Sequence, residues 1–191
     1  RYIISGDEIT PYLVFMNSHD GTGAIKTAMT PIRVVCQNTL NLALSTAKRT
    51  WSSNHTGRIE DRLAEARYDL LYAEKYMGEL GKIIDNLNRK KLSDRQIYEY
   101  IDELFPLIPN ATDMQKKNLL HMKEDLKARY FDAPDLQHVG KNAYRFVNAV
   151  SDFATHAKPL RERANYRENL FSKTVEGNSM IDKAFALVTA A

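Results

Sequence analysis

An uninterrupted apolar heptad pattern constrains this chain more than any other feature of its sequence. The apolar residues alternate at spacings of four and three over four heptads: Ile59, Leu63, Ala66, Leu70, Ala73, Met77, Leu80, Ile84 and Leu87. This alternation is typical of an α-helix with one apolar seam. A helix over residues 58–88 would be about 45 Å long at ~1.5 Å per residue. Gly78 and Gly81 would each weaken it by roughly 1 kcal/mol and allow another backbone to approach closely.

The seam from Ile59 to Leu87 has two interpretations. In the first, which we favour, the seam packs against later helices of the same chain. In the second, it forms the interface of a homo-oligomer. The two alanines on the seam favour close packing, and the pattern by itself leaves both interpretations open.

The residues before this helix predict an antiparallel sheet. Strand-like segments rich in apolar, β-branched or aromatic residues cover residues 2–4, 10–18, 24–30 and 49–53. Glycine turns would join them, including Asp20–Gly23. Pro31 is expected to end the third strand because proline has no N–H for a ladder. A buried helix is then predicted over about 32–47.

The residues after the long helix predict shorter helices. Ser93 with Gln96 and Thr112 with Gln115 have the spacing of capping boxes, which predict helices to about Phe105 and Phe131. Further helices are expected over residues 136–156 and 179–189. The sequence therefore predicts an α+β fold, with a strand-rich part over 1–57 and a helical part over 58–191 that pack into one domain.

Composition bounds the class of protein. The chain of 191 residues is 43% hydrophobic and 27% charged, which is ordinary for a globular protein. No apolar run approaches the ~20 residues that a membrane span needs, and there is no signal peptide. The single cysteine, Cys36, excludes an internal disulfide and fits a reducing compartment. Because the first residue is Arg1, we expect a fragment whose sheet lacks some partner strands.

Two segments near the N-terminus resemble a known family. They are Asn17-Ser-His-Asp-Gly-Thr-Gly-Ala-Ile25 and Thr30-Pro-Ile-Arg-Val-Val-Cys-Gln-Asn-Thr-Leu40, and His55-Thr-Gly-Arg-Ile59 fits the same resemblance. They are similar to the phage/plasmid-like family of uncharacterised proteins, which carry a large domain of unknown function. The resemblance is most specific over residues 12–66. It implies a protein of a phage, plasmid or integrated element in a bacterial cytoplasm, and no particular activity, cofactor or catalytic residue.

A basic-aromatic cluster suggests contact with nucleic acid. Its members are Lys26, Arg33, Lys48, Arg49, Trp51, His55, Arg58 and Arg62. Cations neutralise the phosphate backbone while an aromatic ring stacks on a base, which suits single-stranded DNA. Residues 138–173 add seven basic side chains against three acidic ones. The alternative is an ordinary solvated surface with Trp51 in the core.

Catalytic and metal-binding constellations are weaker. His19, Asp20 and Cys36 would serve a nucleophilic enzyme if they met in space, but Asp20 also suits a turn and Cys36 a buried apolar site. Gly21-Thr-Gly23 joins two strands, whereas phosphate-binding loops open a helix. The amides of Gln37, Asn38 and Asn41 suit a helix cap or a ligand. Asp132, Asp135 and His138 are the nearest approach to a metal cluster, and we expect no metal or cofactor.

The sequence thus favours a non-catalytic, nucleic-acid-associated protein. The predicted binding residues are Lys26, Arg33, Lys48, Arg49, Trp51, Arg58 and Arg62. A structural protein that oligomerises through the helix over 58–88 is the alternative, and an enzyme is the third hypothesis.

Overall fold

The structure, a computed structural model, describes residues 1–4, 6–16, 25–35, 40, 42, 44, 50–53, 59–157 and 177–190. Within these ranges the side chains of residues 25, 53, 59–67, 69 and 70 are not described. The predicted turn over Asp20–Gly23 and the predicted cap residues Gln37, Asn38 and Asn41 lie outside the described residues.

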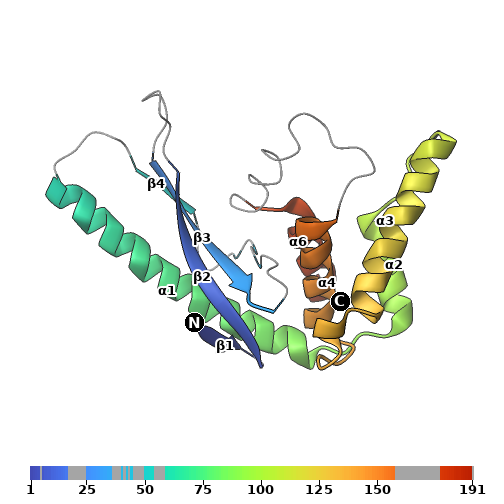
Figure 1. The fold of residues 1–191 in the computed structure, drawn as a ribbon, viewed down its shortest axis with the longest axis horizontal. Helices are drawn as coiled ribbons and strands as arrows, with labels where there is room; N and C mark the ends of the chain where they lie inside the picture. The colour runs from blue at the N-terminus through green and yellow to red at the C-terminus, as the bar shows by residue number, and fades with distance from the viewer. Residues whose placement is uncertain are drawn as a thin grey trace.

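The fold is α+β, as the sequence predicts. A four-stranded antiparallel sheet has the order β1-β2-β3-β4, with bounds Tyr2–Ile4, Asp7–Met16, Ile25–Arg33 and Thr50–Ser53. The described helices follow: α1 Ile59–Arg89, α2 Asp94–Leu104, α3 Asp113–Phe131, the 3-10 helix η1 Pro134–Leu136, α4 Ala143–His156 and α6 Ser179–Ala190. Helix α1 runs along the sheet and continues to the group formed by the other helices (Figure 1).

The end of β3 corrects the prediction around Pro31. The strand does not stop there but continues to Arg33, with Pro31 opposite Pro11. The carbonyl of Pro31 accepts a 2.9 Å hydrogen bond from the N–H of Leu40, so it points away from β2. The nitrogen of a strand residue points to the same side as its carbonyl, so the β2 ladder does not need the N–H that proline lacks.

The helix predicted over 32–47 is wrong at every position that the structure describes. Ile32 and Arg33 belong to β3, and Val34 and Val35 form a turn. Leu40, Leu42 and Leu44 are not helical, although Leu40 and Leu42 are fully buried. Tyr76 of α1 donates a 2.8 Å hydrogen bond to the carbonyl of Leu42. Leu40 and Leu42 therefore contribute to the core without being helical. Their apolar character is also that of a buried helix, so composition alone does not distinguish the two.

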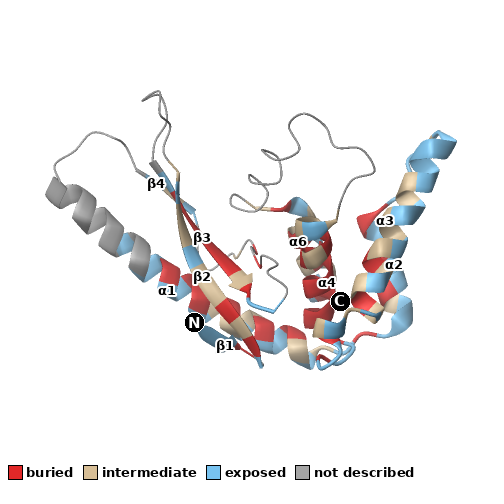
Figure 2. Ribbon diagram, viewed as in Figure 1, coloured by how far each residue is buried: buried red, intermediate tan, exposed pale blue. Residues whose placement is uncertain are grey.

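Helix α1 confirms the long helix and packs its described seam residues inside the chain. Ala73, Met77, Leu80, Ile84 and Leu87 are all buried in the common core. Figure 2 shows the buried residues of α1 toward its C-terminal half. Among the residues that the structure describes, no backbone atom comes close to either glycine. A Cβ on Gly78 would meet nothing within 4 Å, and one on Gly81 would meet only the Ile4 side chain, at 3.7 Å.

The helical part is organised by α4. Both predicted capping boxes are confirmed, at Ser93 for α2 and Thr112 for α3. Helix α4 begins at Ala143 rather than at residue 136, because Asn142 caps it and residues 134–136 form η1. Its buried residues join those of α1, α2, α3 and α6 in one hydrophobic cluster that also includes Ile4, Ile9 and Met29 of the sheet.

Candidate functional site

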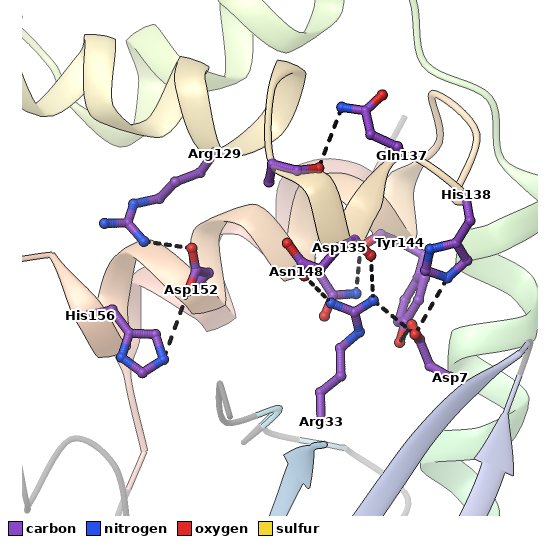
Figure 3. Close-up of polar contacts among 11 residues, drawn as sticks. Asp7, Arg33, Arg129, Asp135, Gln137, His138, Tyr144, Asn148, Asp152 and His156 are labelled. Atoms are coloured by element: carbon purple, nitrogen blue, oxygen red, sulfur yellow. Dashed lines mark hydrogen bonds and ion pairs between the residues drawn. The ribbon is translucent and has the colours of Figure 1, made fainter. Parts of the chain in front are cut away.

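A buried ionic cluster joins the sheet to the helices. We call it the junction cluster; its residues are Asp7, Arg33, Asp135, His138 and Tyr144. Arg33 donates to the carboxylates of Asp7 and Asp135 at 2.8 and 2.5 Å and to the Asp135 carbonyl at 3.0 Å. The Tyr144 phenol donates to the second oxygen of Asp7 at 2.7 Å. Figure 3 shows these groups converging from β2, β3, η1 and α4.

The charges of the junction cluster are paired with one another, which is typical of a cluster that stabilises the fold. The Arg33 side chain is 0% exposed and that of Asp7 only 2%. The buried charge of Asp7 is compensated by Arg33, and that of Arg33 by Asp7 and Asp135 together. Burial, with the adjacent Asp7 carboxylate, raises the pKa of Tyr144 well above its ordinary value, so the phenol remains a hydrogen-bond donor. His138 lies at the open side, with its Nε2 3.6 Å from Asp7 Oδ1.

Three residues singled out from the sequence for other roles belong to the junction cluster. Arg33, predicted to contact nucleic acid, is buried and paired, so it serves the core and not a surface. Asp135 binds Arg33, and His138 faces Asp7. Among the described residues, no three histidine, cysteine or acidic side chains are placed to hold a metal ion.

An aromatic surface lies at the opposite corner of the sheet. We use this name for Phe15, Trp51, Tyr68 and Tyr72. Trp51 of β4 stacks on Tyr72 of α1, with ring centroids 6.1 Å apart and planes at 24°. Tyr68 precedes Tyr72 by one helical turn, and residues four apart share a helix face. Phe15, Tyr68 and Tyr72 are 66%, 62% and 47% exposed, and Trp51 is half-buried.

Strand pairing places Phe15 and Trp51 on the same face of the sheet. Phe15 pairs with Thr27, and Thr27 pairs with Trp51. Directly paired residues of antiparallel strands point to the same face. The sequence left open whether Trp51 belongs to the core or to a surface. In the structure its half-buried indole packs against the hydrophobic core and also stacks on the exposed Tyr72.

The predicted cations are distributed unevenly around this surface. Lys26 is exposed, but it pairs with Met16 and Ser52 and so lies on the face opposite Trp51. Lys48, Arg49, His55 and Arg58 lie outside the described residues, and the Arg62 side chain is not described. Lys75 is an exposed cation one turn after Tyr72. Sequence reasoning missed it because the heptad pattern directs attention to the buried side of the helix.

The basic excess over residues 138–173 is smaller at the surface than the count indicates. Arg145 is buried and donates to the carbonyls of Tyr130, Phe131 and Val139. Lys141 pairs with Asp94 at 2.8 Å. Residues 158–173 lie outside the described part of the chain, as do His19, Asp20 and Cys36 of the enzyme hypothesis.

The chain belongs to the family described as a domain of unknown function (DUF932), whose model matches residues 2–176. No curated protein and no solved structure matches the chain. None of the helices in the described ranges is both long and apolar enough to cross a membrane.

Proposed function

We propose that this protein is a non-catalytic, nucleic-acid-associated protein that favours single-stranded DNA. The observation that carries the proposal is the exposed aromatic surface around the Trp51–Tyr72 stack. Aromatic rings on a sheet and an adjacent helix offer stacking platforms for unpaired bases, and stacking does not depend on base identity. The contact residues of the proposal are Trp51, Tyr72, Phe15 and Lys75.

Cations predicted from the sequence complete this proposal. Lys48 and Arg49 immediately precede β4, which carries Trp51, and Arg58 immediately precedes α1. Arg49 is only two residues before Trp51 in the sequence. Phosphates that follow bases on the aromatic surface would then meet positive charge from Lys48, Arg49 and Arg58.

The cellular setting of the proposal comes from the family resemblance. Similarity to phage/plasmid-like proteins favours a protein of a mobile element that acts in a bacterial cytoplasm, where single-stranded DNA arises during replication and transfer. The single Cys36 fits that reducing compartment.

Fluorescence anisotropy with labelled single- and double-stranded DNA at two salt concentrations tests the proposal. The variant Lys48→Ala/Arg49→Ala/Trp51→Ala is expected to lose salt-sensitive binding, because neutralised phosphates release counterions. The control variant Lys116→Ala/Lys117→Ala/Tyr98→Ala removes two exposed cations and one aromatic ring from α2 and α3. It should bind as the unchanged protein does. Absence of binding at low salt would overturn the proposal.

Oligomerisation through α1 is the second candidate function. The described part of the seam is buried inside the chain, but Tyr68, Leu71 and Tyr72 form an exposed apolar stripe on α1. A second copy could cover this stripe. Sedimentation velocity of Leu71→Glu tests it: loss of a dimer present in the unchanged protein would support this function, and a monomer throughout would overturn it.

A further inference from the structure

We propose that the open edge of β2 pairs with the same edge of a second copy of this chain. The segment concerned is Tyr12–Met16, on the side of β2 that faces away from β3, and we call it the edge segment. The pairing would join two four-stranded sheets into one continuous antiparallel sheet. This inference concerns β2 and not α1, and it does not depend on DNA binding.

Among the described strands, only β3 pairs with the edge segment. Strand β2 has 10 residues; β1 pairs only with the first three of them, whereas β3 pairs with the others as far as Met16. From Thr10 onward no residue of β2 is fully buried. Tyr12 and Phe15, whose side chains point to opposite faces of the sheet, are 52% and 66% exposed. The edge segment is therefore accessible from both faces.

The pairing with β3 determines which backbone groups face the open edge. The N–H of Val34 donates a 2.9 Å hydrogen bond to the carbonyl of Glu8, so the even-numbered residues of β2 direct their backbone groups at β3. Because this direction alternates along an antiparallel strand, Leu13 and Phe15 direct theirs at the open edge. Each supplies one N–H donor and one carbonyl acceptor. Pro11 also faces the open edge, but it has no N–H to donate.

These groups are self-complementary about a two-fold axis beside Val14. In that register Leu13 lies opposite Phe15 of the second copy, and the two residues exchange both N–H···O bonds. The two copies of Val14 then face each other as a non-hydrogen-bonded pair. An axis beside Leu13 would instead place the Phe15 carbonyl opposite the nitrogen of Pro11, which has no hydrogen to donate. The position of Pro11 therefore favours the register centred on Val14.

The side chains of the edge segment suit contact with an identical copy. They are those of tyrosine, leucine, valine, phenylalanine and methionine, so the two copies meet without the repulsion of like charges placed opposite each other. Exposed strand edges are commonly protected from pairing by charged side chains, especially lysine, and the edge segment has none. Pairing would also cover part of the exposed rings of Tyr12 and Phe15, which removes apolar area from water.

The edge segment lies away from the contacts that hold the sheet on the helices. Val14 follows Asp7 of the junction cluster by seven positions, which is about 24 Å along a strand at ~3.4 Å per residue. Figure 1 shows β2 running away from the helices that pack near its beginning. The junction cluster and the proposed pairing therefore use different ends of β2.

Cysteine crosslinking tests the register. The Cα atoms of a non-hydrogen-bonded pair lie about 4.5 Å apart, within the roughly 4.4–6.8 Å that a disulfide spans. We expect Val14→Cys to form a disulfide-linked dimer under mild oxidation, in a Cys36→Ser background that removes the only natural thiol. Tyr12→Cys in the same background is the matched control. The two copies of Tyr12 would lie four positions apart along the paired strands, about 14 Å, and should not crosslink.

Two variants at position 15 test the backbone hydrogen bonds. Phe15→Ala removes the ring alone, whereas Phe15→Pro removes the ring and the N–H that faces the open edge. We expect sedimentation velocity to show a dimer for the unchanged chain, a weaker dimer for Phe15→Ala and only monomer for Phe15→Pro. Because this N–H faces away from β3, the ladder within each copy should remain, and circular dichroism checks that both variants are folded.

The outcomes separate this dimer from the other proposals. Equal crosslinking of the two cysteine variants would overturn it, as would a chain that sediments as a monomer at every concentration. Equal dimerisation of Phe15→Pro and Phe15→Ala would also overturn it. Leu71→Glu, which interrupts an interface through α1, should leave the Val14→Cys crosslink intact, and its loss would assign the dimer to α1 instead. None of these measurements contains DNA, so the proposed function is tested separately.

Discussion

The phenol of Tyr144 donates a 2.7 Å hydrogen bond to Asp7, although the two residues are 137 positions apart in the chain. This bond lies beside the ion pair between Asp7 and Arg33, and both acceptor and donors are buried. The first strand residue of β2 is thereby fixed to α4, the central helix of the other half of the fold. The junction cluster consequently determines how the sheet is oriented on the helices.

Replacement of Asp7 by Asn tests the energetic weight of this junction. Removal of one partner from a buried ion pair leaves the other charge uncompensated and typically costs about 3–5 kcal/mol. Asp135 still pairs with Arg33, so we expect a loss near the lower end of that range, measured by urea denaturation. The control Asp102→Asn alters an exposed ion pair with Lys123 and should change stability by at most ~1 kcal/mol. Equal losses for the two variants would contradict the prediction.

Tyr130 gives the chain a predicted weakness in alkali. Burial raises the pKa of Tyr130 to about 12, whereas an unfolded tyrosine titrates near 10. Between about pH 10 and pH 12 the unfolded chain releases this proton while the folded chain retains it. The free energy of unfolding therefore falls as pH rises through that window, and is unaffected by Tyr130 below it.

The variant Tyr130→Phe should remove that part of the alkaline loss. The Tyr130 hydroxyl is buried and has no hydrogen-bond partner among the described residues, so its deletion should cost little at pH 7. Denaturant titrations at pH 7 and pH 11 measure both effects. The idea fails if the variant is no more stable than the unchanged protein at pH 11.

Arg145 is expected to be essential for the end of α3. Its guanidinium donates to the carbonyls of Tyr130, Phe131 and Val139 at 2.7, 3.1 and 3.1 Å. Helix C-terminal carbonyls lack intrahelical partners and carry a partial negative charge. Arg145→Met keeps much of the apolar stem but removes this donor from the Tyr130 and Val139 carbonyls, whereas Phe131 still accepts from Gln137 at 3.1 Å. We expect a loss of about 2–3 kcal/mol.

Arg95→Met provides the matched control for Arg145. Arg95 pairs with Glu99 on the exposed side of α2, where such pairs contribute about 0.3–0.5 kcal/mol. Thermal unfolding followed by circular dichroism should separate the two variants clearly. Similar midpoints would show that the buried guanidinium is not a structural cap.

Two glycines of α1 should be replaceable with a gain in stability. Alanine is favoured over glycine inside helices by about 1 kcal/mol, and an added Cβ meets no close atom at Gly78 or Gly81. We expect Gly78→Ala/Gly81→Ala to raise the free energy of unfolding by roughly 1–2 kcal/mol. Gly6→Ala should instead destabilise the chain, because Gly6 has a φ of +88°. A destabilised double variant would indicate that these positions have another role, such as contact with a second copy.

Features determined by neighbouring residues were predictable from the sequence. The capping boxes at Ser93 and Thr112 depend on side chains three residues apart, and β4 and α1 lie close to their predicted bounds. The continuation of β3 past Pro31 was not predictable from the sequence. A proline fits inside a strand only if its nitrogen faces away from the neighbouring strand. That orientation depends on the pairing with β2 and on the hydrogen bond from Leu40 to the Pro31 carbonyl.

The candidate site was predictable only in part, for the same reason. Trp51 was singled out from its own segment of the sequence, but Tyr72, which stacks on it, and Phe15, on the same sheet face, come from other elements. Arg33 looks like a surface cation in the sequence because its partner Asp135 is 102 residues away. No local pattern indicates that a cation will be buried by such a distant carboxylate.

The distance between Arg33 and Asp135 also sets an order of events during synthesis. A ribosome adds about 5–20 residues per second, so the 102 residues that separate the two correspond to roughly 5–20 s of translation. During that interval the strands emerge while η1 and α4 are still absent. The nascent sheet must then present Arg33 and the apolar residues around it to water or to a chaperone until the second half of the chain arrives.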